Sequence, residues 1–79
     1  MKLYGYTPTN APVESIRPEE LAEITLCTDP SELKQIAQFL LDCAEEMERM
    51  GAAYDHVHLS DRIRSFESSP HFVVSRAEP

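Results

Sequence analysis

The stretch Asp-Pro-Ser-Glu at residues 29–32 decides the fold, because it has the features of a helix start. The Asp29 side chain can accept a hydrogen bond from the first free N–H groups of a helix. Pro30 suits the first helical position, where its missing N–H is not needed. Glu32, at the third helical position, can reach back to the cap. The sequence therefore predicts that a helix begins at residue 30.

The predicted helix continues to Met50, and Gly51 can end it in a left-handed conformation. Its apolar residues recur at the helical period and cover an arc of roughly 200°. They are Leu33, Ile36, Ala37, Phe39, Leu40, Leu41, Cys43, Ala44, Met47 and Met50. This arc is wider than one sheet face needs. Its margin either packs beneath a loop of the same chain or forms a dimer or partner interface through Phe39, Cys43 and Met50.

Short segments that favour β-strands lie on both sides of this helix. Leu3–Thr7 is rich in strand-forming residues, and Leu21–Thr28 alternates apolar and polar side chains with a period of two. After the helix, Tyr54–Leu59 and His71–Arg76 favour strands, and Ser60–Phe66 favours a loop or one helical turn. The order β-β-α-β-β predicts an α+β fold, in which one long helix packs on a small, mainly antiparallel β-sheet.

The chain length and the distribution of proline predict how these elements are organised. We expect a single small α+β domain over residues 1–79, because 79 residues are enough for only one core. Residues 8–19 contain three prolines and predict a surface loop, since proline removes backbone donors. Residues 77–79 are expected to be a tail. Gly5 indicates a close backbone approach or a bulge in the first strand.

The charge balance excludes several function classes. Seven Lys and Arg residues stand against fourteen Asp and Glu residues, so the formal net charge is -7. Nucleic acids and anionic lipids are bound through Lys and Arg, and we therefore expect neither as a partner. The longest apolar run, residues 39–41, is far shorter than the ~20 residues that span a membrane. With no signal peptide and with Cys27 and Cys43 expected to be buried reduced thiols, the sequence predicts a cytoplasmic protein.

One short segment concentrates groups that could bind a metal ion or a partner, namely Asp55, His56, His58 and Asp61. Two histidines at positions i and i+2 of a strand project from the same face and can reach one ion. No second ligand motif completes a shell, and His71 could join only if the last strand lies alongside. His56 and His58 are therefore weak metal candidates. The alternatives are a hydrogen-bonded polar pair and a patch that faces a partner.

Catalytic motifs are not found in the sequence. Cys43 lies on the apolar side of the predicted helix, where a thiol is inert. There is no nucleophile elbow of the G-x-S-x-G type and no glycine-rich phosphate loop. The chain is also too short to combine a core with a sizeable substrate pocket. We expect no enzymatic activity, no catalytic residues and no cofactor.

The acidic residues form two clusters. Asp42, Glu45, Glu46 and Glu48 lie on the predicted helix, and only Glu45 has a cation, Arg49, four residues later. A second cluster surrounds the proline-rich loop and comprises Glu14, Glu19, Glu20 and Glu23. A charged helix face is usually just solvated. Unbalanced carboxylates can also speed the capture of a positively charged partner.

Several stretches, taken in order and spacing, resemble a family of small bacterial proteins. They are Glu23–Leu26, Pro30–Leu33, Ile36–Met47, Tyr54–Asp61 and Phe72–Val74. The family that they resemble is that of the immunity proteins of polymorphic toxin systems catalogued as number thirty-two. The resemblance covers roughly residues 21–75.

The resemblance implies a cytoplasmic antitoxin that binds a cognate toxin domain and blocks it by occupying its surface. We expect that toxin to be basic. Together with the acidic helix face, the residues that match the family's histidine motif form a predicted partner-binding set. It comprises Asp42, Glu45, Glu46, Asp55, His56, His58 and Asp61. The alternatives are a homodimeric structural or regulatory module and a protein that binds a transition metal weakly.

Overall fold

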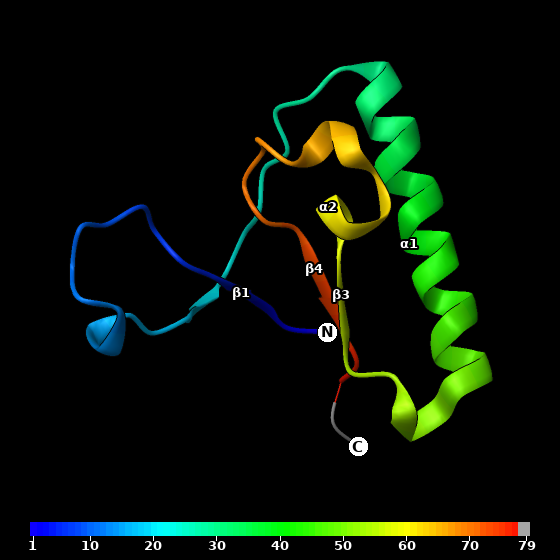
Figure 1. Cartoon of the computed structure of the whole chain (residues 1–79), viewed down its shortest axis with the longest axis horizontal. Coiled ribbons are helices and arrows are strands. Elements are labelled where there is room, and N and C mark those ends of the chain that lie inside the picture. Colours follow the sequence, from blue (N-terminus) through cyan, green and yellow to red (C-terminus); the bar gives the residue numbers. More distant parts are fainter. Residues whose placement is uncertain (78–79) are drawn as a thin grey trace.

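The computed structural model describes residues 1–77, in which two strands precede a long helix and two follow it (Figure 1). The strands and α-helices are β1 (Leu3–Gly5), β2 (Glu19–Leu21), α1 (Pro30–Met50), β3 (His56–His58), α2 (Leu59–Arg62) and β4 (Val73–Ser75). Short 3-10 turns lie at Val13–Ser15, Gly51–Ala53 and Arg64–Phe66. The expected α+β class is confirmed. Of the expected tail at residues 77–79, the last two residues lie outside the described part.

Helix α1 has the predicted bounds, and its caps explain why. The Glu32 N–H donates to Asp29 Oδ1 over 2.8 Å, as the cap predicts. The Glu32 side chain does not reach back to the cap backbone, but accepts from the Thr28 hydroxyl over 2.8 Å. At the other end Gly51 has a φ of 56°, and its N–H donates to the carbonyl of Met47. Both helix ends are thus set by local chemistry.

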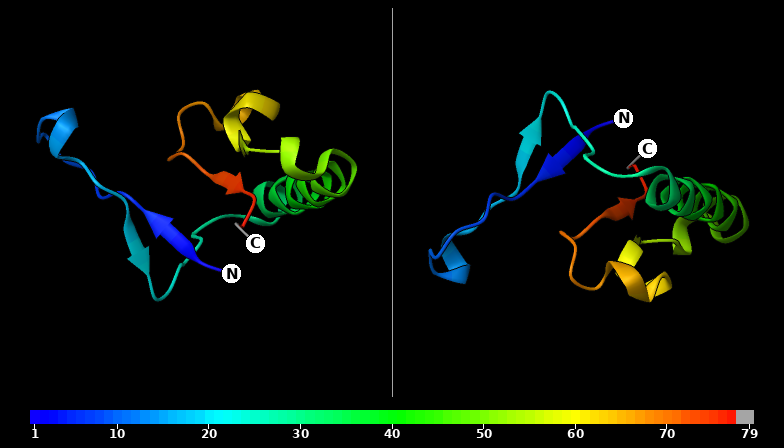
Figure 2. Two further views of the ribbon diagram at one scale, coloured as in Figure 1. Left: turned by 90° about the horizontal axis from the view of Figure 1, so that it is seen from below. Right: turned by 90° about the horizontal axis from the view of Figure 1, so that it is seen from above.

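The four strands form two separate two-stranded antiparallel sheets and not the single sheet that the sequence predicted. In the first, β1 pairs with β2. In the second, β3 pairs with β4 so that Val57 lies opposite Val74. Only the β3–β4 hairpin packs against α1, while β1 and β2 project away from it (Figure 2). The helix therefore covers one hairpin.

The projecting part, residues 1–21, is called the arm below. The arm makes the molecule less compact. Its radius of gyration is 13.9 Å, whereas a compact chain of this length would have about 11.6 Å. The predicted proline-rich loop connects the two strands, but it contains the turn Val13–Ser15 and ends before Glu19, which begins β2. At Gly5 the expected close backbone approach or bulge is not seen: the strand pairs in regular register, and the atom that a Cβ would meet is the Leu21 side-chain Cδ1, at 2.9 Å.

The predicted strand Leu21–Thr28 is wrong after its first residue. From Glu23 to Asp29 the backbone forms no helix, turn, bend or paired strand, and every residue is exposed. Within the described chain, none of residues 22–28 makes a backbone hydrogen bond. An alternating sequence indicates that successive side chains point to opposite faces. A β-strand also needs a second strand beside it with which to form backbone hydrogen bonds. In the part of the chain that the structure describes, the segment has no such neighbour.

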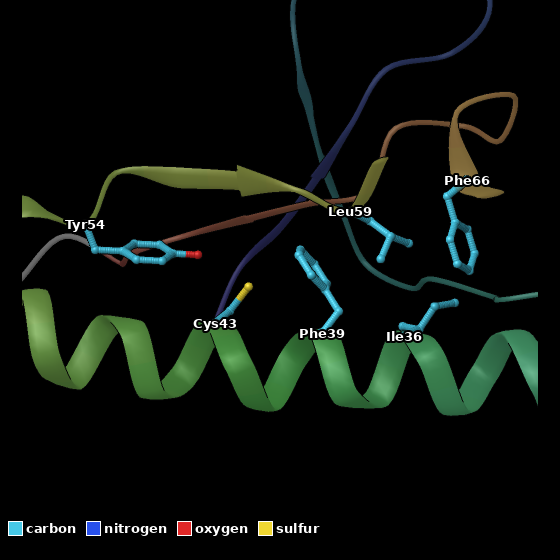
Figure 3. Close-up of a cluster of buried hydrophobic side chains, with 6 residues drawn as sticks. All are labelled: Ile36, Phe39, Cys43, Tyr54, Leu59 and Phe66. Carbon is cyan, nitrogen blue, oxygen red and sulfur yellow. The ribbon is translucent and has the colours of Figure 1, made fainter. Parts of the chain in front are cut away.

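The core lies between α1 and the elements that follow it (Figure 3). The buried side chains are Ile36, Phe39, Cys43, Tyr54, Leu59 and Phe66. Phe39 also meets the ring of Phe72 edge-on, with centroids 6.5 Å apart. The predicted dimer surface of Phe39, Cys43 and Met50 is therefore wrong for its first two members, which the chain itself covers. Met50 remains 41% exposed.

The two cysteines differ in their surroundings. Cys43 is 1% exposed, as predicted, but Cys27 is exposed, and both are free thiols. Cys27 lies in the segment that joins neither of the two sheets of the described chain. In the described residues, no helix is both long and apolar enough to cross a membrane.

Tyr54 links the core to β4 and makes the stability of the protein sensitive to alkali. Its hydroxyl donates to the Val74 carbonyl over 3.0 Å. Burial raises the pKa of Tyr54 to about 12, and the neighbouring Cys43 side chain adds to the shift. A raised pKa means that the folded state holds the proton more tightly. Its stabilising contribution is complete below pH 10, the ordinary Tyr value, and is lost as the pH rises towards 12.

We therefore expect the free energy of unfolding to fall as the pH rises from 10 towards 12, with Tyr54 contributing to that fall. Tyr54→Phe should cost about 1 kcal/mol at pH 7, because the hydrogen bond is lost, and should flatten this alkaline fall. Urea unfolding followed by circular dichroism at several pH values measures both. The matched control is Tyr6→Phe, since Tyr6 is 64% exposed. An equal alkaline fall in Tyr54→Phe would contradict the assignment.

Candidate partner-binding surfaces

The outer side of α1 carries carboxylates that have no cation partner among residues 1–77. Asp42, Glu45 and Glu48 are exposed. Asp42 accepts from Gln38 Nε2 over 2.9 Å. Among residues 1–77, no Lys or Arg forms an ion pair with any of these three carboxylates. We call Asp42, Glu45 and Glu48 the acidic surface.

Glu46, predicted to be part of the same site, is held within the molecule. Its two oxygens accept from Arg62 over 2.8 Å and 3.0 Å, so the pair is bidentate and joins α1 to α2. Arg49 lies near the same carboxylate at 3.9 Å and does not make the expected pair with Glu45. The hydrogen bond from Arg62 holds the pKa of Glu46 below its usual value. Glu46 therefore has a structural partner that its neighbours on the helix lack.

The Glu46–Arg62 pair predicts a pH-dependent stability. Because the pKa of Glu46 is lowered on folding, its contribution is present above pH 4.5 and is lost as the pH falls through the folded value. We expect Glu46→Gln to lower the melting temperature at pH 7 by a few degrees and to differ less from wild type at pH 3. Glu45→Gln makes the same charge change without breaking a pair, and serves as the control in thermal melts. Equal losses in both variants would contradict this role for the pair.

The histidines form a second surface on the outer face of the β3–β4 hairpin. His56 and His58 share one face, as predicted, and their ring centroids are 5.4 Å apart. His71, just before β4, lies 5.5 Å from the His58 ring, so the last strand does bring it into the group. His56 Nδ1 lies 2.7 Å from Asp55 Oδ2. We call His56, His58 and His71 the histidine face.

The predicted site residues are thus divided between two sides of the molecule. On β3 the side chain of Val57 packs towards the core and α1, so its neighbours His56 and His58 point away from the helix. The acidic surface belongs to α1 itself. Asp61 is exposed on α2, next to Arg62 and hence near the Glu46 edge of the helix. One partner would have to reach around the chain to touch both surfaces.

The metal alternative gains no support from this geometry. Within residues 1–77, no three His, Cys, Asp or Glu side chains are placed so that they could hold one ion. The three rings meet edge to face, as neighbouring polar aromatic groups on a surface do. The histidine face therefore offers imidazole nitrogens for hydrogen bonds to a partner.

An apolar groove of about 400 Å³ was not anticipated from the short chain. It lies between the extended segment after β2 and the turn that leads into β4. Its apolar lining is Ile24, Leu26, Ile36, Leu59, Phe66, Pro70 and Phe72. The alternation of Ile24 and Leu26 was the available signal, because it marks a one-sided apolar surface without saying what covers it.

Comparison with known proteins identifies the family. The family model for Immunity protein 32 matches residues 23–77, which include α1, β3, β4 and the extended segment but exclude the arm. No curated protein and no solved structure matches the chain significantly. The match spans more than half of the 79 residues and agrees with the resemblance over residues 21–75. The chain therefore belongs to the immunity protein 32 family.

Proposed function

We propose that this protein is an antitoxin, which binds a cognate bacterial toxin domain and neutralises it by covering its surface. The observation that carries the proposal is the family match over residues 23–77. Immunity by occlusion requires a stable, rigid surface and no catalytic group. The helix and hairpin, joined by one buried cluster, fit that requirement.

The charge of the chain supports a basic toxin. The formal net charge is -7, and the acidic surface has no intramolecular cation within the described residues. Exposed carboxylates that repel each other reduce stability slightly, but they attract and orient a positively charged partner. Asp42, Glu45 and Asp61 are the proposed contacts on this side. Nucleic acids and membrane surfaces would be repelled by the same charges.

The histidine face is the proposed second contact, with Asp55 beside it. Glu46 contributes in a different way, because its pair with Arg62 holds α2, and with it Asp61, against the helix. The proposal includes no cofactor and no reaction. The sole buried thiol in the described core, Cys43, packs among apolar side chains, where a thiolate is disfavoured. We place the protein in the cytoplasm, where a producing cell needs protection.

The experiment is coexpression with the toxin domain encoded next to the gene of this chain. Cells that make both proteins should grow as cells without toxin do, and cells that make the toxin alone should die. An unrelated protein of similar size and negative charge, expressed at the same level, controls for charge alone. If cells die at the same rate with and without this chain, the proposed function is wrong.

A further inference from the structure

The extended segment after the arm has the properties of a β-strand except for a neighbour. Its sequence, Glu23–Thr28, alternates apolar and polar residues, and its backbone forms no helix, turn or bend. Its N–H and C=O groups pair with no backbone group of residues 1–77. A row of free backbone donors and acceptors in this form is a template for another strand. We call residues 24–28 the docking segment.

The apolar groove lies directly beside the docking segment. Ile24 and Leu26 form one wall and remain 49% and 45% exposed. Leu59, Phe66 and Phe72 contribute to the remaining lining. In strand addition, backbone hydrogen bonds supply affinity, and pockets for alternate side chains supply specificity. This site offers both, on one contiguous stretch of surface.

The charges around the docking segment indicate which strand would fit. Between Arg17 and Lys34 the chain has five carboxylates and no cation. They are Glu19, Glu20, Glu23, Asp29 and Glu32, and the last of these lines the groove. Pairing of two copies of this chain would bring both sets of carboxylates together, and like charges in adjacent strands are destabilising. A strand that carries Lys or Arg would be attracted.

We propose that an edge strand of the toxin adds to the docking segment, with apolar side chains in the groove and Lys or Arg side chains among the surrounding carboxylates. The inference rests on the proposed function and specifies how and where the partner binds. It also explains why this segment, which makes no backbone hydrogen bond of its own to the described chain, lies within the region that matches the family.

Proline substitution tests the backbone contacts. In a strand, successive N–H groups point to opposite edges, so Thr25→Pro or Leu26→Pro removes a donor from the edge that the toxin uses. The controls are Thr25→Ala and Leu26→Ala, which keep the N–H. Isothermal titration with an inactivated form of the toxin domain from the adjacent gene should show at least ten-fold weaker binding for one proline variant than for its own alanine control. Thermal melts should remain within a few degrees of wild type, because this segment is outside the core.

Hydrogen exchange provides a second, direct measurement on the unaltered chain. Amides of the docking segment should exchange freely in the isolated protein and become protected when the toxin domain is added. Amides in the arm loop at Thr9 and Asn10, which are also exposed, should not change and serve as the internal reference.

Three results would overturn the inference. If wild type binds the toxin domain and neither proline variant is weaker than its alanine control, the toxin binds elsewhere and the proposed function stands. If the segment becomes protected without toxin, as the protein concentration rises, a second copy occupies it. If wild type does not bind or protect at all, the proposed function fails and the inference fails with it.

Discussion

Replacing Phe39 by alanine is expected to destabilise the protein by about 3–5 kcal/mol. The side chain is 3% exposed and comes from the middle of α1, and it contacts the ring of Phe72 edge-on. Its removal leaves a cavity at the junction of the helix and the hairpin. A chain of this size has a total stability of roughly 4–12 kcal/mol, so the loss could leave much of it unfolded at 37 °C.

The measurement is urea unfolding followed by circular dichroism, and α1 provides a matched control. Leu41→Ala also truncates an apolar side chain of the same helix, but at a position that is 60% exposed. It should cost less than about 1 kcal/mol. If Phe39→Ala and Leu41→Ala lose equal stability, the core does not lie where the structure places it. A Phe39→Ala variant that stays folded and still protects cells from the toxin would also contradict this position of the core.

Helix α1 could be predicted to the residue because its ends depend on local chemistry. The Asp29 cap and the positive φ at Gly51 each concern neighbouring residues only. The apolar side of the helix follows from a period of 3.6 residues. Strands β3 and β4 were also located, because each shows its alternation within a few residues, and the structure pairs them across the connection that contains α2.

The extended segment around Thr25 shows where the sequence misleads. Its pattern is more regular than that of β3, yet β3 has a neighbour in the described chain and this segment has none. Pairing is a property of two segments, and its entropy cost depends on the chain between them. For the same reason the exposure of Cys27 could not be predicted from its own surroundings. The wrong prediction is still informative, because a sequence that alternates like a strand but pairs with no strand in the described chain indicates that its neighbour belongs to a partner.

The candidate site was predicted in part. The shared face of His56 and His58 follows from strand geometry, but the approach of His71 depends on how β4 pairs. The Glu46–Arg62 pair joins residues that are 16 positions apart, through the packing of α2 on α1. The sequence could give the sign of the surface charge, but not which carboxylate was already neutralised.

Substituting lysine at both Asp42 and Glu45 is expected to slow association with the toxin domain about ten-fold at low ionic strength. Each substitution changes the charge by two, so the formal net charge rises from -7 to -3. Both side chains are exposed and without a cation in the described structure, so the fold should be unaffected. Stopped-flow mixing with the inactivated toxin domain measures the association rate constant. In 1 M salt the screening length is only about 3 Å, and the variant and wild type should then associate at similar rates.

The matched control separates local from overall charge. Asn10→Lys, Ala11→Lys and Glu14→Lys in one variant make the same change in net charge, from -7 to -3, at exposed positions of the arm. If the acidic surface faces the toxin in the encounter, only the helix variant should slow association strongly. If both variants slow it equally, the chain attracts the toxin through its net charge alone. If neither variant slows association, the toxin does not recognise the negative charge, and the carboxylates on α1 only keep that face of the helix in contact with water. A selective effect of the helix variant, combined with a selective effect of proline in the docking segment, would show that the toxin reaches from the groove to the outer side of the helix.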